Sequence, residues 1–279
     1  MSERIANGVV EETIEQEKKF ELPEKAAHPK RVYGLFLGIG SVISVVYGFQ
    51  QFYPGFIGPL SNVIPSLLAT GAFLAALMNA RKYGFRLRER EFDRIWFCFA
   101  VGAACWIFAE ASWAVYYFSG IDVPYPGIPD VFYIAAYVPL SLAVFFYFRS
   151  FAGALTKSRR LFSIPAILAS IILVVAVVLP EEQSDPRPLL TALTDWAYPA
   201  ADLILLSLII LSLAIFAGGT ISKWWYWLAG GIIVDIIGDE LFLYQVAQGT
   251  YYNGGIDDLL YVWAYLIIGL AFYLHMREL

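Results

Sequence analysis

The stretch Gly127-Ile128-Pro129-Asp130-Val131-Phe132-Tyr133-Ile134-Ala135-Ala136-Tyr137 has a second copy near the end of the chain. That copy is Gly255-Ile256-Asp257-Asp258-Leu259-Leu260-Tyr261-Val262-Trp263-Ala264-Tyr265, and without gaps the two share the pattern G-I-x-D-x-x-Y-x-x-A-Y. Positions i, i+3 and i+7 fall on one face of a helix, so each copy places a carboxylate and two phenols on one stripe. A pattern repeated at so long a spacing in a chain of 279 residues predicts an internal duplication.

The composition predicts a membrane protein. Hydrophobic residues make up 59% of the chain and charged residues 15%, and the mean hydropathy is +0.63. Its apolar segments run about 20 residues each, which is the length needed to cross roughly 30 Å of hydrocarbon. We therefore expect an all-α polytopic protein whose first partner is the lipid bilayer. A net charge of −5 without a basic patch argues against a nucleic-acid partner.

Eight transmembrane helices are predicted after a polar tail at 1–31. They lie near 32–52, 58–80, 94–118, 129–149, 161–180, 189–217, 223–247 and 257–276. The membrane domain, 32–279, then divides into half-repeats of about 32–150 and 160–279. Four spans in each half give both halves the same orientation, so this is a parallel repeat related by an axis along the membrane normal.

The connections alternate in charge. Of the 19 Lys and Arg residues, all but Arg187 fall in the tails and in the connections of one side. Cytoplasmic loops carry the excess of Lys and Arg, so both termini are predicted to be cytoplasmic and the protein to lie in the cell membrane as a multi-pass protein. Trp224, Trp225 and Trp227 follow Lys223 and predict an aromatic belt at the cytoplasmic interface.

Several kinds of site are disfavoured. Both cysteines lie inside one apolar segment, which leaves no disulfide framework. Of the two histidines, His28 lies in the polar tail and His275 at the end of the last apolar segment, which argues against haem and histidine-rich zinc sites. No lysine lies in the interior of a predicted span, since Lys223 stands at the very start of its span, so a retinal Schiff base is also excluded. The residues identify no cofactor and leave a metal undetermined.

Carboxylates and tyrosines gather in the half of the membrane opposite the termini, and no Lys or Arg accompanies them there. A carboxylate in hydrocarbon costs several kcal/mol unless it faces a cavity, finds a partner or takes a proton. Aromatic faces attract organic cations, and phenols donate to carboxylates. These residues predict an outward-facing pocket for a small or lipidic ligand, lined by Glu110, Asp130, Tyr133, Tyr137, Asp202, Asp235, Asp239, Asp258, Tyr261 and Tyr265. The carboxylates could equally serve as hydrogen-bonding partners between helices, with no ligand.

Two other functions remain open. Asp202 and Asp239, the latter preceded by Gly238, resemble the two-aspartate layout of intramembrane aspartyl proteases, in which two carboxylates share one proton. Midplane carboxylates are also typical of cation- or proton-coupled transporters. An enzyme of the first kind requires Asp202 and Asp239 to face each other across one water molecule.

Three stretches carry a resemblance to a known family. Residues 125–140 look like a P-S-x-A-D-x-x-Y-L-x-x-Y-P-L pattern, 198–206 like Y-P-x-x-D-L-L-L-L, and 249–258 like G-T-Y-x-x-G-x-x-x-D. Together they resemble the multi-span N-terminal membrane region of bacterial and archaeal signalling proteins, which precedes PAS, histidine kinase, diguanylate cyclase or phosphodiesterase domains. The likeness covers about 95–276 and departs at Val138, which separates Tyr137 from Pro139. It implies a sensory role, and with no output domain in this sequence the signal is expected to pass to a partner protein.

Overall fold

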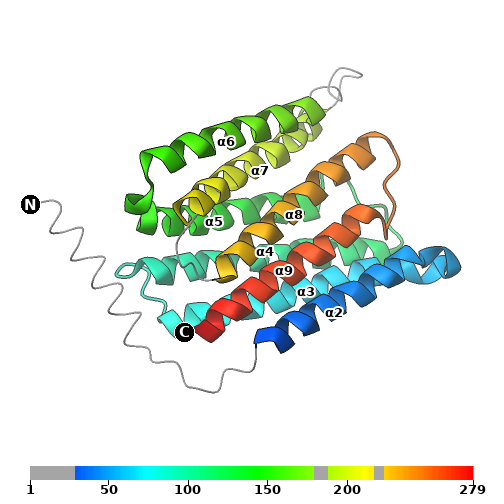
Figure 1. The fold of residues 1–279 in the computed structure, drawn as a ribbon. Coiled ribbons are helices and arrows are strands. Elements are labelled where there is room, and N and C mark those ends of the chain that lie inside the picture. Colours follow the sequence, from blue (N-terminus) through cyan, green and yellow to red (C-terminus); the bar gives the residue numbers. More distant parts are fainter. Residues whose placement is uncertain (1–28, 179–187, 217–222, 279) are drawn as a thin grey trace, which may run out of the picture.

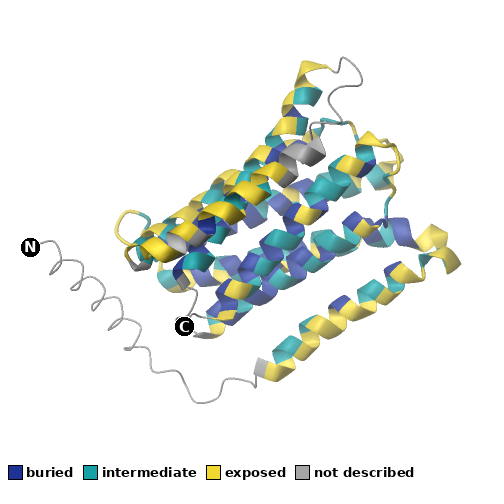
Figure 2. Ribbon diagram, turned by 45° about the horizontal axis from the view of Figure 1, so that its top comes forward, coloured by how far each residue is buried: buried dark blue, intermediate teal, exposed yellow. Residues whose placement is uncertain are grey.

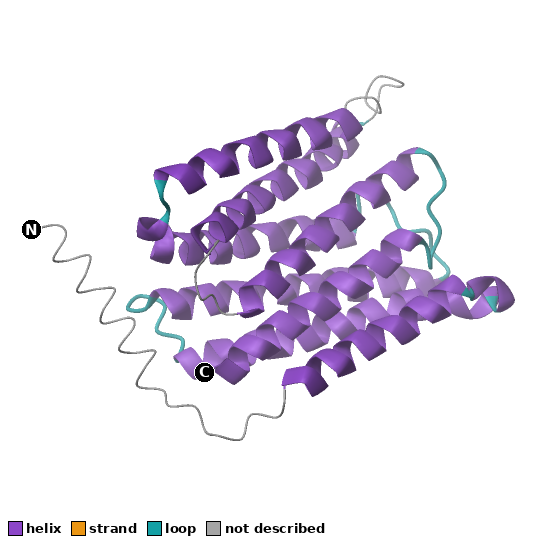
Figure 3. Cartoon of the chain, in the orientation of Figure 1, coloured by secondary structure: helices purple, strands orange, loops and turns teal. Residues whose placement is uncertain are grey.

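The computed structural model describes residues 29–178, 188–216 and 223–278, and all regular structure in them is helical (Figure 3). Eight long helices run roughly lengthwise through the bundle (Figure 1). They are α2 (Pro29–Gly48), α3 (Pro54–Tyr83), α4 (Glu91–Ser119), α5 (Ile128–Phe151), α6 (Lys157–Val178), α7 (Leu189–Phe216), α8 (Lys223–Ala247) and α9 (Ile256–Glu278). Two single 3-10 turns, η1 (Gln50–Phe52) and η2 (Ala152–Ala154), join α2 to α3 and α5 to α6.

Six of these helices are long and apolar enough to cross a membrane, namely α2, α3, α4, α5, α7 and α9. Among the residues whose side chains the structure describes, α6 contributes a shorter apolar stretch, Ser163–Ile172. The other helix outside this group of six is α8, which contains the charged residues Asp235, Asp239 and Glu240. Each of the eight segments expected from the sequence overlaps one of the described helices, so the all-helical architecture is confirmed, with six helices long and apolar enough to cross a membrane. The predicted tail, 1–31, lies almost wholly outside the described residues.

Helix packing follows a regular scheme. The helices α4 and α5 pack as one pair, and α8 and α9 pack as another. The helix before each pair contacts the other pair as well: α3 packs on α9, and α7 packs on α5. The buried residues concentrate at the centre of the bundle, whereas α2, which lies against α9, is exposed along most of its length (Figure 2). In a bilayer the exposed apolar side chains of α2 would face lipid.

Both helix pairs are closely packed at a glycine. A Cβ built on Gly102 of α4 would lie 2.6 Å from Cδ2 of Leu140 on α5. On Gly231 of α8 it would lie 2.6 Å from Cγ1 of Ile268 and 3.1 Å from the backbone nitrogen of that residue on α9. The two glycines occupy equivalent positions when α4 and α8 are aligned at their C-terminal ends, and Leu140 and Ile268 are equivalent when the two motif copies are aligned, so the same close approach occurs in both halves. Small residues allow helix backbones to approach in this way.

The helices α4 and α8 also end in the same manner. Gly120 and Gly249 both have positive φ, 66° and 65°, a left-handed conformation that favours glycine. The amide of Ile121 donates to the carbonyl of Tyr116, and the amide of Thr250 donates to the carbonyl of Gln245. Each of these two bonds reaches back five residues, as in the Schellman arrangement that satisfies carbonyls at a helix C-terminus. After each of these helix ends the chain enters the connection that precedes one copy of the repeated motif.

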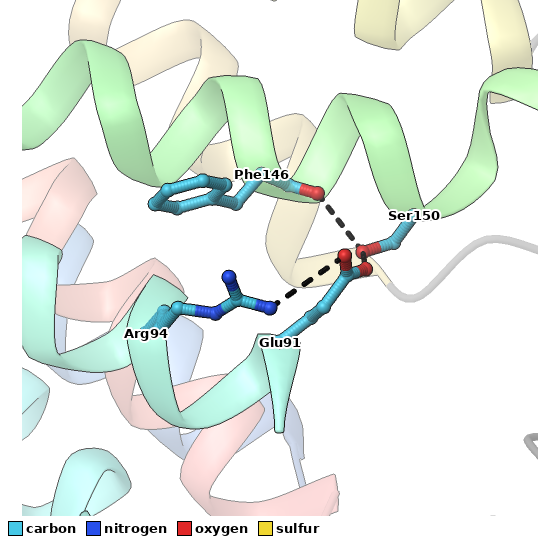
Figure 4. A network of polar contacts seen from close by, with 4 residues as sticks. All are labelled: Glu91, Arg94, Phe146 and Ser150. Atoms are coloured by element: carbon cyan, nitrogen blue, oxygen red, sulfur yellow. Dashed lines mark hydrogen bonds and ion pairs between the residues drawn. The ribbon is translucent and has the colours of Figure 1, made fainter. Parts of the chain in front are cut away.

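At the opposite end of the bundle, where α4 begins and α5 ends, a small polar network joins these two helices (Figure 4). Glu91 lies 3.7 Å from Arg94, whose guanidinium sits over the ring of Phe146 at 5.2 Å. The hydroxyl of Ser150 lies 2.7 Å from Oε2 of Glu91 and 2.9 Å from the carbonyl of Phe146. These contacts fix the end of α5 against the start of α4.

The prediction of a tryptophan belt was wrong for two of its three members. Trp224 and Trp225 are 1% and 0% exposed. The ring of Trp225 stacks on Tyr147 of α5 at 4.0 Å, and Trp224 meets His275 of α9 at 4.5 Å. These tryptophans are core residues because α5 and α9 cover them, and only Trp227 remains partly exposed.

Candidate functional site

A cavity of about 60 Å³ lies at the end of the bundle where α4 and α8 finish and α3, α5 and α9 begin. At roughly 10–15 Å³ per water molecule it has room for about four to six waters, or for a ligand with a similar number of heavy atoms. None of the described residues that line it is a lysine or an arginine. Nine of the ten residues predicted from the sequence do, namely Glu110, Asp130, Tyr133, Tyr137, Asp235, Asp239, Asp258, Tyr261 and Tyr265.

Two carboxylates receive a phenol from each half of the chain. Oε1 of Glu110 accepts hydrogen bonds from Tyr133 at 3.0 Å and from Tyr265 at 2.7 Å. Asp239, the counterpart of Glu110 on α8, accepts from Tyr261 at 2.8 Å and from Tyr137 at 2.5 Å. Each carboxylate thus binds one tyrosine of its own helix pair and one of the other pair. This arrangement satisfies both carboxylates and joins the two pairs around the cavity.

The aspartate that opens each motif caps its own helix. Oδ2 of Asp130 accepts the amide of Gly127 at 2.7 Å, and Oδ2 of Asp258 accepts the amide of Gly254 at 2.5 Å. Carboxylates in the first turn are favoured there by the unpaired N–H groups and by the helix dipole. Oδ1 of Asp130 also accepts the hydroxyl of Tyr198 on α7 at 2.8 Å. Both aspartates line the cavity, but these bonds show that they also hold the helix starts in place.

Asp202 is the one predicted residue that does not line the cavity. It is 0% exposed and lies behind Tyr137, whose hydroxyl is 2.6 Å from its Oδ1 and 2.5 Å from Oδ2 of Asp239. A phenol carries one hydroxyl proton and can donate to only one of them. The other contact therefore requires that one of the two carboxyl groups holds a proton and donates to the phenol oxygen. The phenol of Tyr137 thus bridges Asp202 and Asp239, an arrangement that fits a pair of aspartates holding one carboxyl proton.

Asp235 has a different environment from every other carboxylate of the site. It lies one helical turn before Asp239 on the same face, as its i, i+4 spacing predicts, and it is 8% exposed. Among the described residues, no hydrogen bond or ion pair reaches its carboxylate. Glu240, which follows Asp239 directly and therefore points about 100° away around the helix, is not part of the cavity wall.

Aromatic side chains that the sequence did not single out as site residues complete the wall. Trp113, Phe242 and Tyr251 meet edge to face, with ring centroids 6.0, 6.0 and 5.1 Å apart. Burial and the nearby carboxylates, Asp258 first among them, raise the pKa of Tyr251, so its phenol stays neutral. Trp106 also lines the cavity. A sequence signal for two of these side chains exists. When the two halves are aligned at Glu110 and Asp239, Trp113 corresponds to Phe242 and Trp106 corresponds to Asp235.

The described residues contain no group of three or more His, Cys, Asp or Glu side chains placed to hold a metal ion. The geometry is that of an acidic, aromatic cavity whose carboxylates are mostly held by phenols. Comparison with protein-family models, with curated proteins and with solved structures finds no match to this chain.

Proposed function

We propose that this chain is an integral membrane ligand-binding module of the sensor type. One observation carries the proposal: carboxylates and phenols from both helix pairs converge on a single cavity, with no basic side chain in its wall. Structural hydrogen bonding alone accounts for Glu110 and Asp239, which are paired, but not for the cavity or for the unpaired Asp235. The volume of about 60 Å³ suits a small molecule rather than the body of a lipid.

The proposed topology has eight membrane spans, both termini in the cytoplasm and the cavity near the outer surface of the cell membrane. The charge distribution supports it, because all but Arg187 of the Lys and Arg residues fall on the side of the termini. The proposal counts α6 and α8 as spans. For α8 the support is that two of its carboxylates, Asp235 and Asp239, line the cavity rather than face lipid. In this arrangement α2–α5 and α6–α9 are the two copies of a duplicated unit. Two features support that duplication. Tyr137 and Tyr265 each donate to a carboxylate of the other helix pair, and Gly102 and Gly231 make equivalent close contacts.

Signalling through a partner protein is the part that rests on the resemblance of 95–276 to membrane sensor regions. The aspartyl-type enzyme is the weaker candidate, because the hydroxyl of Tyr137 occupies the place between Asp202 and Asp239 where that chemistry needs a water molecule. A cation-coupled transporter would use the same cavity. No contact in the described residues favours it over a sensor.

A ligand screen with a blocked cavity tests the proposal. The purified protein in detergent is heated with small cationic, neutral and anionic compounds, and its unfolding temperature is compared with that of Leu243→Phe, which adds volume at the cavity wall. At least one compound is expected to stabilise the parent protein and not this variant. Ile237→Phe, on the same helix but 51% exposed, is the matched control and should keep the response. A flat response from the parent protein to every class, or stabilisation that survives in Leu243→Phe, contradicts the proposal.

A further inference from the structure

Among the described residues, the carboxylate of Asp235 has no partner, whereas the other carboxylates that line the cavity are hydrogen-bonded. Phenols or backbone amides bind the carboxylates of Glu110, Asp130, Asp239 and Asp258. Asp235 is more than nine-tenths buried, lines the cavity and has no hydrogen-bonding or ionic partner among the residues that the structure describes. A buried carboxylate without a partner is costly, and Asp239 one turn away adds like-charge repulsion. A cationic donor inside the cavity would remove both costs.

The wall around Asp235 fits such a donor. Trp113, Phe242 and Tyr251 present aromatic surface to the same cavity, and aromatic faces attract cations that have left water. When Glu110 is aligned with Asp239, the position on α4 that corresponds to Asp235 is Trp106, whose side chain also lines the cavity. The two helix pairs therefore contribute a carboxylate from one side and an indole from the other.

Charge and size narrow the class of ligand. An anion, or the phosphate of a lipid headgroup, would meet several carboxylates and no lysine or arginine. A multivalent metal ion would need a set of protein ligands that the described residues do not provide. About four to six heavy atoms fit the volume, which corresponds to an ammonium group with a short alkyl chain.

We propose that the cavity binds a small organic amine in its ammonium form, with Asp235 accepting its N–H groups and the aromatic wall holding its alkyl part. This inference rests on the proposed ligand-binding function and names the chemical class of the ligand. Asp235 is then a binding residue, and Trp113 and Phe242 contribute to affinity through the cation and the alkyl chain.

Propylammonium chloride is a suitable probe, with propan-1-ol as the neutral molecule of the same size and sodium chloride as the salt control. Unfolding temperature and tryptophan fluorescence of the full chain are followed in detergent and again in lipid nanodiscs. Only the ammonium salt is expected to stabilise the protein and change its fluorescence. Asp235→Asn should weaken binding at least tenfold, whereas Asp122→Asn, an exposed loop aspartate, should leave binding unchanged.

Asp235→Asn removes an unpaired charge, so the ligand-free variant should fold and unfold at the same temperature as the parent or higher. Phe242→Leu, which keeps the carboxylate, is a second variant and should weaken binding by a smaller factor. Equal responses to propan-1-ol or sodium chloride, or unchanged affinity in Asp235→Asn, overturn the amine assignment. If another class of compound stabilises the parent but not Leu243→Phe, the assignment of the ligand as an amine is wrong and the ligand-binding function stands. If no compound of any class stabilises the parent protein, both the amine assignment and the proposed ligand-binding function are wrong.

Discussion

Tyr265 of α9 donates its hydroxyl to Glu110 of α4 over 2.7 Å, across the boundary between the two helix pairs. Tyr137 of α5 makes the corresponding bond to Asp239 of α8 over 2.5 Å. The two bonds run in opposite senses between the pairs and flank one cavity. The residues that shape the cavity therefore also hold the two pairs together, so a change in the cavity can alter the packing of one pair against the other.

The two exchanged tyrosines should differ in their contribution to stability. Tyr265→Phe removes one of two donors to Glu110, which keeps Tyr133. Tyr137→Phe removes the bridge between Asp202 and Asp239 and leaves Asp202 without its phenol. Hydrogen bonds between membrane helices contribute about 0.6 kcal/mol on average and up to about 1.7 kcal/mol. On that scale Tyr265→Phe is expected to lower the free energy of unfolding by about 1 kcal/mol, and Tyr137→Phe by about twice as much.

Thermal unfolding in detergent measures this difference, and about 1 kcal/mol corresponds to roughly 2–4 °C for a protein of this size. Tyr244→Phe is the control, because Tyr244 lies on α8 but is 49% exposed. Equal losses in Tyr137→Phe and Tyr265→Phe would contradict the bridging role of Tyr137.

Neighbouring glycines of α8 should respond in opposite directions to the same substitution. A Cβ on Gly231 would meet Cγ1 of Ile268 at 2.6 Å and the carbonyl oxygen of Ala264 at 3.3 Å, while a Cβ on Gly230 has open space. Gly231→Ala is expected to destabilise the protein by about 1–3 kcal/mol, the usual cost of overpacking. Gly230→Ala should be neutral or stabilise by up to about 1 kcal/mol, since alanine favours the helix. Unfolding temperatures of the two variants check this, and an unchanged unfolding temperature in Gly231→Ala would argue against the close approach of α8 and α9.

Helix positions follow from the sequence because length, apolarity and the repeated motif are local properties. The stripe of Tyr133 and Tyr137, with its copy at Tyr261 and Tyr265, likewise predicts the residues that meet at the cavity. The depth of Asp202 could not be predicted, since it depends on Tyr137 lying between it and the cavity.

Two aromatic side chains were missed for different physical reasons. The burial of Trp225 depends on Tyr147 of α5, a contact between distant parts of the chain that no local pattern reports. The place of Trp106 in the cavity wall was missed because the two copies are offset by one residue between the helices and the motifs that follow them. The connection from Gly249 to Gly255 is one residue shorter than the connection from Gly120 to Gly127, so the alignment that matches the two motif copies does not match the helices before them.

The proposed topology can be checked with single cysteines. In a background with Cys98 and Cys105 replaced by alanine, Asp122→Cys and Arg88→Cys introduce thiols into exposed connections at opposite ends of the bundle. A membrane-impermeant maleimide added to intact cells is expected to label position 122, and to label position 88 only after the membrane is opened. Labelling of position 88 first would reverse the orientation, and labelling of both at once would contradict the eight-span arrangement.

Substitution of Asp202 separates a structural proton-sharing bridge from an aspartyl enzyme. The amide of Asp202→Asn can donate to the oxygen of Tyr137, which then donates to Asp239, so this variant reproduces the protonated form of the pair. Its unfolding temperature is expected to remain within a few degrees of the parent. Asp202→Ala leaves a buried phenol contact unmade and should lose about 1–3 kcal/mol. Any ligand response found for the parent should persist in Asp202→Asn, because residue 202 lies outside the cavity wall. Loss of that response in a stable Asp202→Asn protein would instead require an ionised Asp202, as a two-aspartate catalytic or ion-coupling site does.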